Sequence, residues 1–228
     1  MKFQRPFNHL SLFAFLISLL YLNGCRDLGP ESKILDLYTS PKINAYNIHR
    51  VALLPMAQDD TTDSGTFYST NHFFNELQKN YSDIKFVVPD LNESYGYDTL
   101  IPNFIESIEK LKRLDLKSFF NTDIGASVDE ENPDAIIIGK IDRTIPKSGF
   151  IRRYYANVVS CEFRYYLISL VDGRVLWKAD VLGEEGYYLS QIIDLFPPLD
   201  LALSNGIDKI ITNLPFNKSS EQSETLEK

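Results

Sequence analysis

The stretch from Ala156 to Gly183, ANVVSCEFRYYLISLVDGRVLWKADVLG, holds two alternating segments joined by Asp172-Gly173. In the first segment one face carries Val159, Cys161, Phe163, Tyr165 and Leu167, and the other carries Ser160, Glu162, Arg164 and Tyr166. Alternation of this kind is typical of a half-buried strand, and Asp-Gly is a strong two-residue hairpin signal. The returning segment places Val175, Trp177 and Ala179 on one face. We therefore predict an antiparallel hairpin.

On both sides of this hairpin, the sequence predicts a mixture of strands and helices. Short apolar runs between turn residues indicate buried strands at 49–56, 84–90 and 134–145. Helical spacing indicates helices at 69–81, 103–114, 116–124 and 197–214, with Ser69 as an N-cap and Pro198 near the last helix start. The predicted fold is a single α/β domain in which a mixed sheet, in the order β-α-β-α-β-β-β-α, is flanked by helices.

The first 25 residues have the features of an export signal that ends in a lipidated cysteine. Lys2 and Arg5 precede an apolar run from Leu10 to Leu22, which at about thirteen residues is shorter than the ~20 needed to span a bilayer. The tetrapeptide Leu-Asn-Gly-Cys at 22–25 resembles the lipobox of bacterial lipoproteins. That resemblance implies lipidation of Cys25, palmitate included. The alternative is an ordinary signal anchor with an incidental cysteine.

This leader divides the chain into four predicted parts. They are a signal peptide at 1–24, a lipidated cysteine and tether at 25–47, the α/β domain at 48–216 and a disordered tail at 217–228. Removal of the leader takes Lys2 and Arg5 from 23 basic residues and leaves 21 against 31 acidic ones, a net charge of −10. An acidic chain lacks the basic face that nucleic acids require, so we expect no nucleic-acid partner.

Three phrases of the domain resemble landmarks of one group of envelope proteins. They are VALLPM at 51–56, NPDAIIIGKI at 132–141 and YYLISLVDGRVLWKA at 165–179. The group contains the curli-secretion lipoprotein CsgG, the penicillin-binding-protein activator LpoB and the N-terminal domain of TolB. The resemblance implies an anticodon-binding-domain-like α/β fold and a place in the bacterial envelope. Met56 and Asn132 depart from the group's usual residues, and the turn at Asp172 is shortened.

The common catalytic and cofactor motifs are absent from the sequence, so we expect no enzyme, no cofactor and no metal. His49, His72 and Cys161 fall on predicted elements and are interpreted as structural. The loop after the first strand offers oxygens at Asp59, Thr61 and Asp63 in calcium-loop spacing, but Ser64 and Thr70 replace the required Gly and Glu. A plain polar loop is the simpler interpretation. A metal-binding loop, or a hydrolase that uses Asp59, Asp60 and Asp63, remains an alternative.

The segment KSGFIRRYYAN at 147–157 carries the densest positive cluster, interleaved with aromatic residues. Because aromatic residues and arginines are enriched at interface hot spots, we predict a partner-binding site. Its residues are Lys147, Phe150, Arg152, Arg153, Tyr154 and Tyr155. The alternative is a strand pair whose rings are simply packed. The apolar loop GEEGYYLSQIIDLFPP at 183–198 is a second candidate.

Together these features predict a membrane-attached protein with a protein partner rather than an enzyme. The expected location is the outer membrane, facing the periplasm; the inner-membrane outer leaflet and the cell surface are alternatives. The expected role is a non-catalytic docking or accessory factor for an envelope assembly or secretion complex. A secretion-pore subunit like CsgG is the main alternative, although the sequence predicts no strands beyond those of the core sheet.

Overall fold

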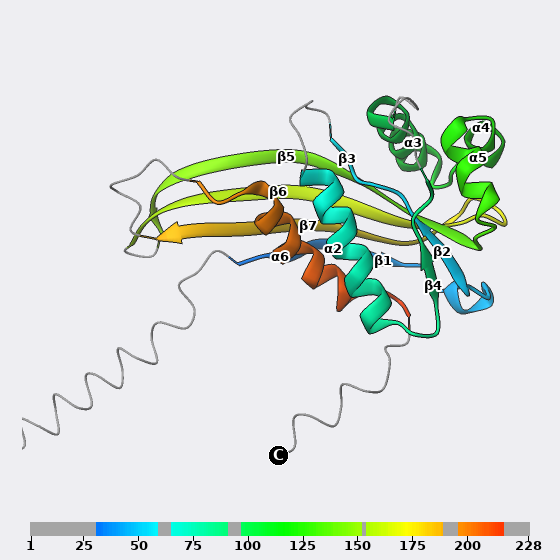
Figure 1. Cartoon of the computed structure of the whole chain (residues 1–228), viewed down its shortest axis with the longest axis horizontal. Helices are drawn as coiled ribbons and strands as arrows, with labels where there is room; N and C mark the ends of the chain where they lie inside the picture. Colours follow the sequence, from blue (N-terminus) through cyan, green and yellow to red (C-terminus); the bar gives the residue numbers. More distant parts are fainter. Residues whose placement is uncertain (1–30, 59–64, 91–96, 152–153, 189–195, 217–228) are drawn as a thin grey trace, which may run out of the picture.

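The protein's structure, a computed structural model, describes residues 31–58, 65–90, 97–151, 154–188 and 196–216. The lipobox, the acidic loop at 59–63 and the tail lie outside these residues. In the described part the predicted α/β fold with one mixed sheet is confirmed (Figure 1). No helix of the described part combines the length and apolarity that a membrane crossing requires.

In the described residues, seven strands form the sheet, in the spatial order β1-β7-β6-β5-β2-β4, with β3 paired to β5. β2 is parallel to its neighbours β4 and β5. Along the rest of the sheet, from β5 through β6 and β7 to β1, each strand is antiparallel to the next. The strands are β1 Lys33–Thr39, β2 Arg50–Leu53, β3 Ala57–Gln58, β4 Lys85–Val87, β5 Ala135–Ile151, β6 Tyr154–Ser169 and β7 Val175–Tyr188.

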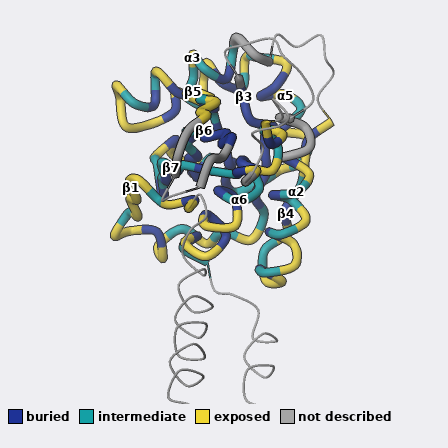
Figure 2. Tube along the Cα trace, turned by 90° about the vertical axis from the view of Figure 1, so that its left-hand side faces the viewer, coloured by how far each residue is buried: buried dark blue, intermediate teal, exposed yellow. Residues whose placement is uncertain are grey.

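Helices cover both faces of this sheet and give three layers. They are α2 Gly65–Asn80, α3 Tyr97–Leu111, α4 Leu116–Phe120, α5 Asp123–Glu130 and α6 Leu199–Ile211, with a 3-10 turn η1 at Ile43–Ala45. Alternate strand residues feed two separate cores: Val51 and Leu53 pack with α2 and α6, while Ala52 and Leu54 pack with α3, α4 and α5. Buried residues follow this division, running along the sheet and the inner helix faces (Figure 2).

Local capping sets the starts of the short helices, and the structure corrects one predicted cap. The Asp115 carboxylate accepts from the backbone N–H groups of Lys117 and Ser118, and Thr122 Oγ1 accepts from the N–H of Gly125 at 3.1 Å. The single helix predicted at 116–124 is therefore two helices. Ser69 lies inside α2 and is not its N-cap, because the helix already begins at Gly65.

The predicted hairpin is confirmed, but its turn is longer than two residues. The N–H of Gly173 donates to the Ser169 carbonyl at 3.0 Å, and the N–H of Ser169 donates to the Arg174 carbonyl at 3.0 Å. A register shift at Leu167/Ile168 moves Val175 to the opposite face from Trp177. The prediction that these two share a face was wrong because one irregular position inverts the alternation.

The predicted tether is wrong from residue 33 onward, because β1 pairs with β7 along its length. The pairing runs from Lys33 opposite Leu182 to Thr39 opposite Trp177. A register shift between Ile34 and Asp36 interrupts the alternation of apolar residues. Because of this irregularity, apolar and polar residues do not alternate along β1, so the sequence pattern does not indicate a strand.

The ends of β5, β6 and β7 form a three-stranded arm whose base is still covered by α6, since Asn205 of α6 donates to the Glu184 carbonyl at 2.9 Å. We define the arm as Thr144–Ile151 of β5, Tyr154–Cys161 of β6 and Gly183–Tyr188 of β7. It projects past α2 and α6 at one end of the molecule (Figure 1). β2 and β3 pair with β5 only as far as Ile141. Beyond that point no described strand lies on this side of β5, so Pro146, which lacks an N–H group, interrupts no hydrogen bond there.

Candidate docking surfaces

The described residues of the predicted partner site fall at the end of the arm. Lys147 is exposed and lies opposite Val158, and the backbone of Phe150 lies opposite Tyr155. Tyr154 begins β6. Arg152 and Arg153 lie outside the described residues, as do the side chains of Phe150, Tyr154 and Tyr155. The arm therefore brings Lys147 and the backbones of Phe150, Tyr154 and Tyr155 to one end, while the role of the predicted site stays a prediction. Cys25 also lies outside the described chain.

The chain enters the sheet at the base of the arm. Ser32 Oγ accepts from the backbone N–H of Glu184 at 2.9 Å and donates to the Glu184 carbonyl at 3.4 Å. Ser32 is 6% exposed, so it is held in place next to β7. On the neighbouring strand, Ser160 Oγ donates to Glu184 Oε1 at 2.8 Å. The N-terminal segment is thus fastened to the arm and not to the opposite end of the sheet.

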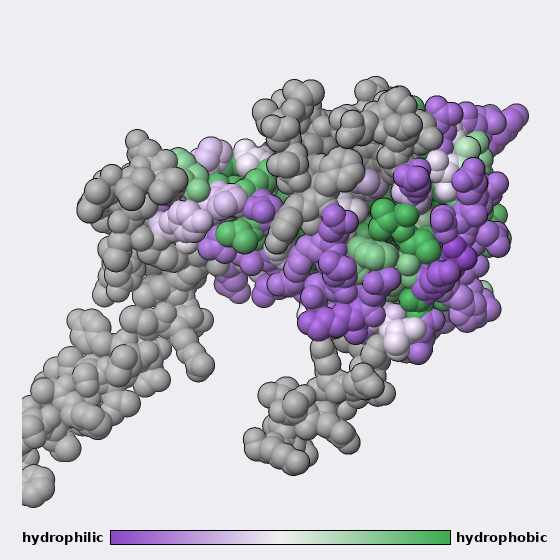
Figure 3. Space-filling model, in the orientation of Figure 1, coloured by the Kyte–Doolittle hydropathy of each residue, from purple (hydrophilic) through white to green (hydrophobic). Residues whose placement is uncertain are grey.

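Hydrophobic and weakly polar residues are prominent on the arm in Figure 3, whereas strongly hydrophilic residues gather over the helix-covered end. Among the arm side chains that the structure describes, two polar ones are buried, Asn157 at 2% and Ser160 at 1% exposure. Ser148 Oγ donates to Asn157 Oδ1 at 2.7 Å. The buried polar groups of the arm are therefore hydrogen-bonded, as stable burial requires.

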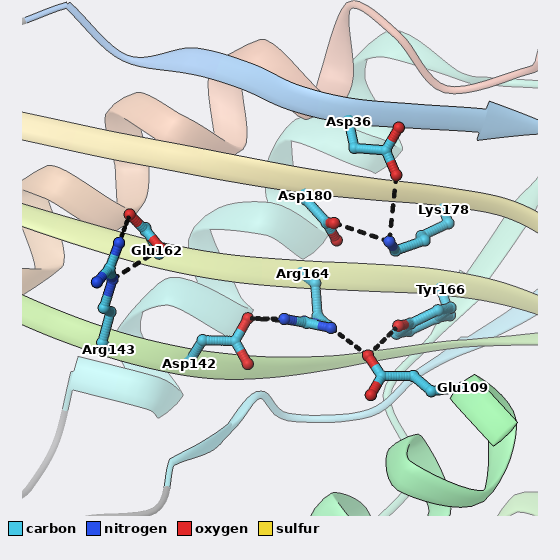
Figure 4. Close-up of polar contacts among 9 residues, drawn as sticks. All are labelled: Asp36, Glu109, Asp142, Arg143, Glu162, Arg164, Tyr166, Lys178 and Asp180. Carbon is cyan, nitrogen blue, oxygen red and sulfur yellow. Dashed lines mark hydrogen bonds and ion pairs between the residues drawn. The ribbon is translucent and has the colours of Figure 1, made fainter.

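On the face that carries α3, the strands β6, β7 and β1 present a network of charged side chains (Figure 4). Arg164 is central: its guanidinium donates to Asp142 at 2.6 Å and to Glu109 of α3. The Tyr166 hydroxyl donates to the same Glu109 oxygen at 2.9 Å. Burial raises the pKa of Asp142 against the lowering effect of Arg164. Burial also raises the pKa of Tyr166. Its hydroxyl therefore stays protonated and can donate.

Three further ion pairs extend this network along the sheet. Lys178 Nζ donates to Asp180 at 2.7 Å and to Asp36 of β1 at 3.3 Å. Burial would lower the pKa of Lys178, but these carboxylates outweigh it and raise the pKa. Arg143 donates to Glu162 through two nitrogens, at 2.8 and 2.5 Å. The acids of this face are therefore matched with bases from neighbouring elements.

A hollow lies where β1 and β7 meet the last turn of α3. Its volume is about 500 Å³, and Tyr38, Lys112 and Val175 are among its lining residues. A second hollow of about 600 Å³ shares those three residues and adds a group of cations. We call this second hollow the basic groove; it is lined by Tyr38, Ser40, Pro41, Lys42, Leu111, Lys112, Arg113, Arg174 and Val175.

The backbone fixes the cations of the basic groove. α3 ends at Leu111, and Lys112 adopts a φ of 57°, with its N–H donating to the Ile108 carbonyl at 2.7 Å. This turn leads Arg113 into an antiparallel bridge with Arg174. Gly173, with a φ of +73°, sits so close that an added Cβ would lie 2.2 Å from the Leu114 carbonyl oxygen. The groove thus depends on a close backbone contact.

The other residues singled out in the sequence have structural surroundings where they are described. Cys161 is a free, fully buried thiol, which confirms the predicted buried position, and burial raises its pKa to about 12. His72 Nε2 lies 3.4 Å from Asp208 Oδ1, and the backbone N–H of His49 donates to Asp134 at 2.8 Å. Asp59, Asp60 and Asp63 lie outside the described chain, and its described part contains no cluster of potential metal ligands.

No family model and no curated protein matches the chain. Solved structures that are similar include PelC from Paraburkholderia phytofirmans, crystallised as a dodecamer, at 13% identity, 82% coverage of this chain, 99% of that chain and a TM-score of 0.45. Lipoprotein GNA1162 from Neisseria meningitidis is 11% identical, with coverages of 73% and 99% and a TM-score of 0.39. The hypothetical protein CT253 from Chlamydia trachomatis is 10% identical, with coverages of 73% and 95% and a TM-score of 0.45.

The structural neighbours therefore include a lipoprotein and a PelC protein. Likeness of this extent assigns no function to the chain. The narrower grouping with CsgG, LpoB and TolB is not confirmed by these comparisons and stays a prediction.

Proposed function

We propose that this chain is a lipid-anchored protein of the bacterial envelope that acts as a non-catalytic docking or accessory factor for an envelope assembly or secretion complex. The anchor is Cys25, and the outer membrane facing the periplasm is the proposed location. The observation that carries the proposal is the pairing of Ser32 with Glu184 at the base of the arm.

This pairing bears on how far the domain can stand from its anchor. Six residues lie between Cys25 and Ser32, and the seven residue steps from one to the other span only about 25 Å when fully extended. The arm continues for eight residues of β5, which corresponds to about 25 Å of strand. An anchored chain would therefore keep the base of its arm within about 25 Å of the membrane. A position close to the bilayer favours a partner in the same membrane over one reached through a long linker.

In-cell cross-linking, followed by affinity purification and mass spectrometry, tests the proposal. The wild-type chain is compared with Cys25→Ala, and a photo-reactive residue at Lys147 reports on the arm. We expect an envelope protein that is cross-linked in the wild type and lost in the variant. Self-contacts alone, or the same partner in both chains, would contradict anchored docking.

A secretion-pore subunit is the second candidate, and one observation favours it. β5, β6 and β7 contain 17, 16 and 14 residues, and β5 and β7 are longer than the strands predicted for them from the sequence. A ring of several copies in detergent, seen by light scattering and electron microscopy, would replace the accessory role with the pore. A monomer or dimer would count against the pore.

A further inference from the structure

We infer that the basic groove binds an acidic, partly apolar segment of a partner protein. This inference deepens the proposed docking role and rests on it. The groove lies at the Thr39 end of β1, whereas Ser32 and the arm lie at the Lys33 end. A partner segment in the groove would thus approach the domain on the end away from its anchor.

Charge is the first observation that supports this assignment. In a chain with a net charge of −8, four cations line one hollow: Lys42, Lys112, Arg113 and Arg174. Within the described part of the chain, Arg174 pairs with Asp172 at 3.2 Å, while the side chains of the other three form no ion pair. The acids of the adjoining hollow, Asp36 and Glu109, are already held by Lys178 and Arg164. Arg113 also lies near Asp115 and helps to lower its pKa, so the unmatched positive charge of the groove comes from Lys42 and Lys112.

The backbone provides a second, independent observation. Lys112 occupies a left-handed conformation that Gly or Asn adopts at lower cost. Arg113 and Arg174 face each other across a bridge, where like charges are mutually destabilising. Local stability alone would favour neither a lysine at position 112 nor two arginines that face each other at positions 113 and 174. A negatively charged ligand between the cations would offset both costs.

The walls of the groove distinguish a peptide from a simple anion. Tyr38 is 46% exposed and Leu111 is 60% exposed, and both line the groove beside Val175. A phosphate group or an anionic sugar would leave these apolar surfaces in water. A peptide with alternating acidic and apolar residues covers them. β1 is also the outer strand of the sheet, so an extended peptide finds backbone hydrogen-bonding groups alongside.

The test is a binding measurement on the full chain in detergent. The probe is a short fluorescent peptide of alternating Glu and Val, followed by anisotropy at low salt. Matched peptides alternate Lys with Val, or Glu with Ser. We expect the Glu-Val peptide to bind tightest and to weaken as salt rises. Equal binding of the Lys-Val peptide would overturn the inference. Equal binding of the Glu-Ser peptide or of polygalacturonate would replace the peptide with a general anion.

Two substitutions separate binding from folding. Lys112→Gly relieves the left-handed lysine, and Arg113→Glu removes the like-charge pair with Arg174 but places an acid near Asp115, so the double variant should keep a melting temperature close to that of the wild type. Together they should weaken peptide binding about tenfold, since each exposed charge contributes a fraction of that change. The control is Lys85→Glu, an exposed lysine on β4. Unchanged binding in the double variant, or equal loss in the control, would overturn the inference.

The same double variant separates this inference from the proposed function in cells. If the cross-linked envelope partner disappears in Lys112→Gly/Arg113→Glu while Cys25 lipidation is intact, the groove is its docking site. If the partner is still captured, the docking role stands and the groove assignment fails. If the wild type captures no partner although the purified chain binds the peptide, the proposed envelope role fails and the groove remains.

Discussion

At the scale of residues, a few positions determine the geometry around the basic groove. Gly173 combines a positive φ with a close approach to Leu114, whose N–H donates to the Gly173 carbonyl at 2.7 Å. The sequence identified Asp172-Gly173 as a turn signal, and this was correct. It could not reveal the contact with Leu114, because the two segments are about sixty residues apart.

Gly173→Ala should destabilise the protein by about 1–3 kcal/mol, because the new Cβ is strained and meets the Leu114 carbonyl oxygen. Chemical denaturation monitored by Trp177 fluorescence measures the change. Val171→Ala is the control in the same turn, since Val171 is 79% exposed. Equal stability of the two variants would show that this contact does not constrain the turn.

The pair of Arg143 and Glu162 gives a pH prediction. Arg143 donates to the Glu162 carboxylate and holds its pKa below the ordinary 4.5. An acid with a lowered pKa stabilises the fold above its ordinary pKa, and this contribution is lost as pH falls through the lowered value. Arg143→Gln should therefore raise the pKa of Glu162 in a carboxyl NMR titration. An unchanged titration would mean that the pair does not form in solution.

At the scale of elements, the sequence predicted the regular strands and missed the irregular ones. The first hairpin strand alternates without interruption, and its apolar face is buried as predicted. β1 was missed because the shift after Ile34 breaks its pattern, and the end of β5 was missed because Pro146 argues against a strand. The basic groove was out of reach because its cations come from three separate segments of the chain.

Hydrogen exchange tests β1 directly. Amides of 33–39 that bond to β7 should exchange slowly in the wild type. Ile34→Asp places a charge on a side chain that packs against the core, so β1 should detach and its amides should exchange faster. Leu35→Asp is the matched control, because Leu35 is 48% exposed. Fast exchange throughout β1 in the wild type would instead support the predicted tether, in which residues 33–39 form no strand.

At the scale of the whole molecule, β1 links two ends with different proposed tasks. Its Lys33 end lies by the arm and by the chain that leads back to Cys25, and its Thr39 end leads into the basic groove. The sequence predicts the anchor, but only the strand pairing gives the domain a direction relative to it. The central claim is that the anchored domain holds its arm toward the membrane and its groove away.

Fluorescence quenching by lipids tests that claim most directly. The lipidated chain, with Cys161→Ser, is reconstituted in vesicles that contain spin-labelled headgroups, and a fluorophore is attached at Lys147→Cys on the arm or at Lys42→Cys in the groove. The account predicts strong quenching at position 147 and little at position 42. Equal quenching at both positions, or stronger quenching at position 42, would contradict it.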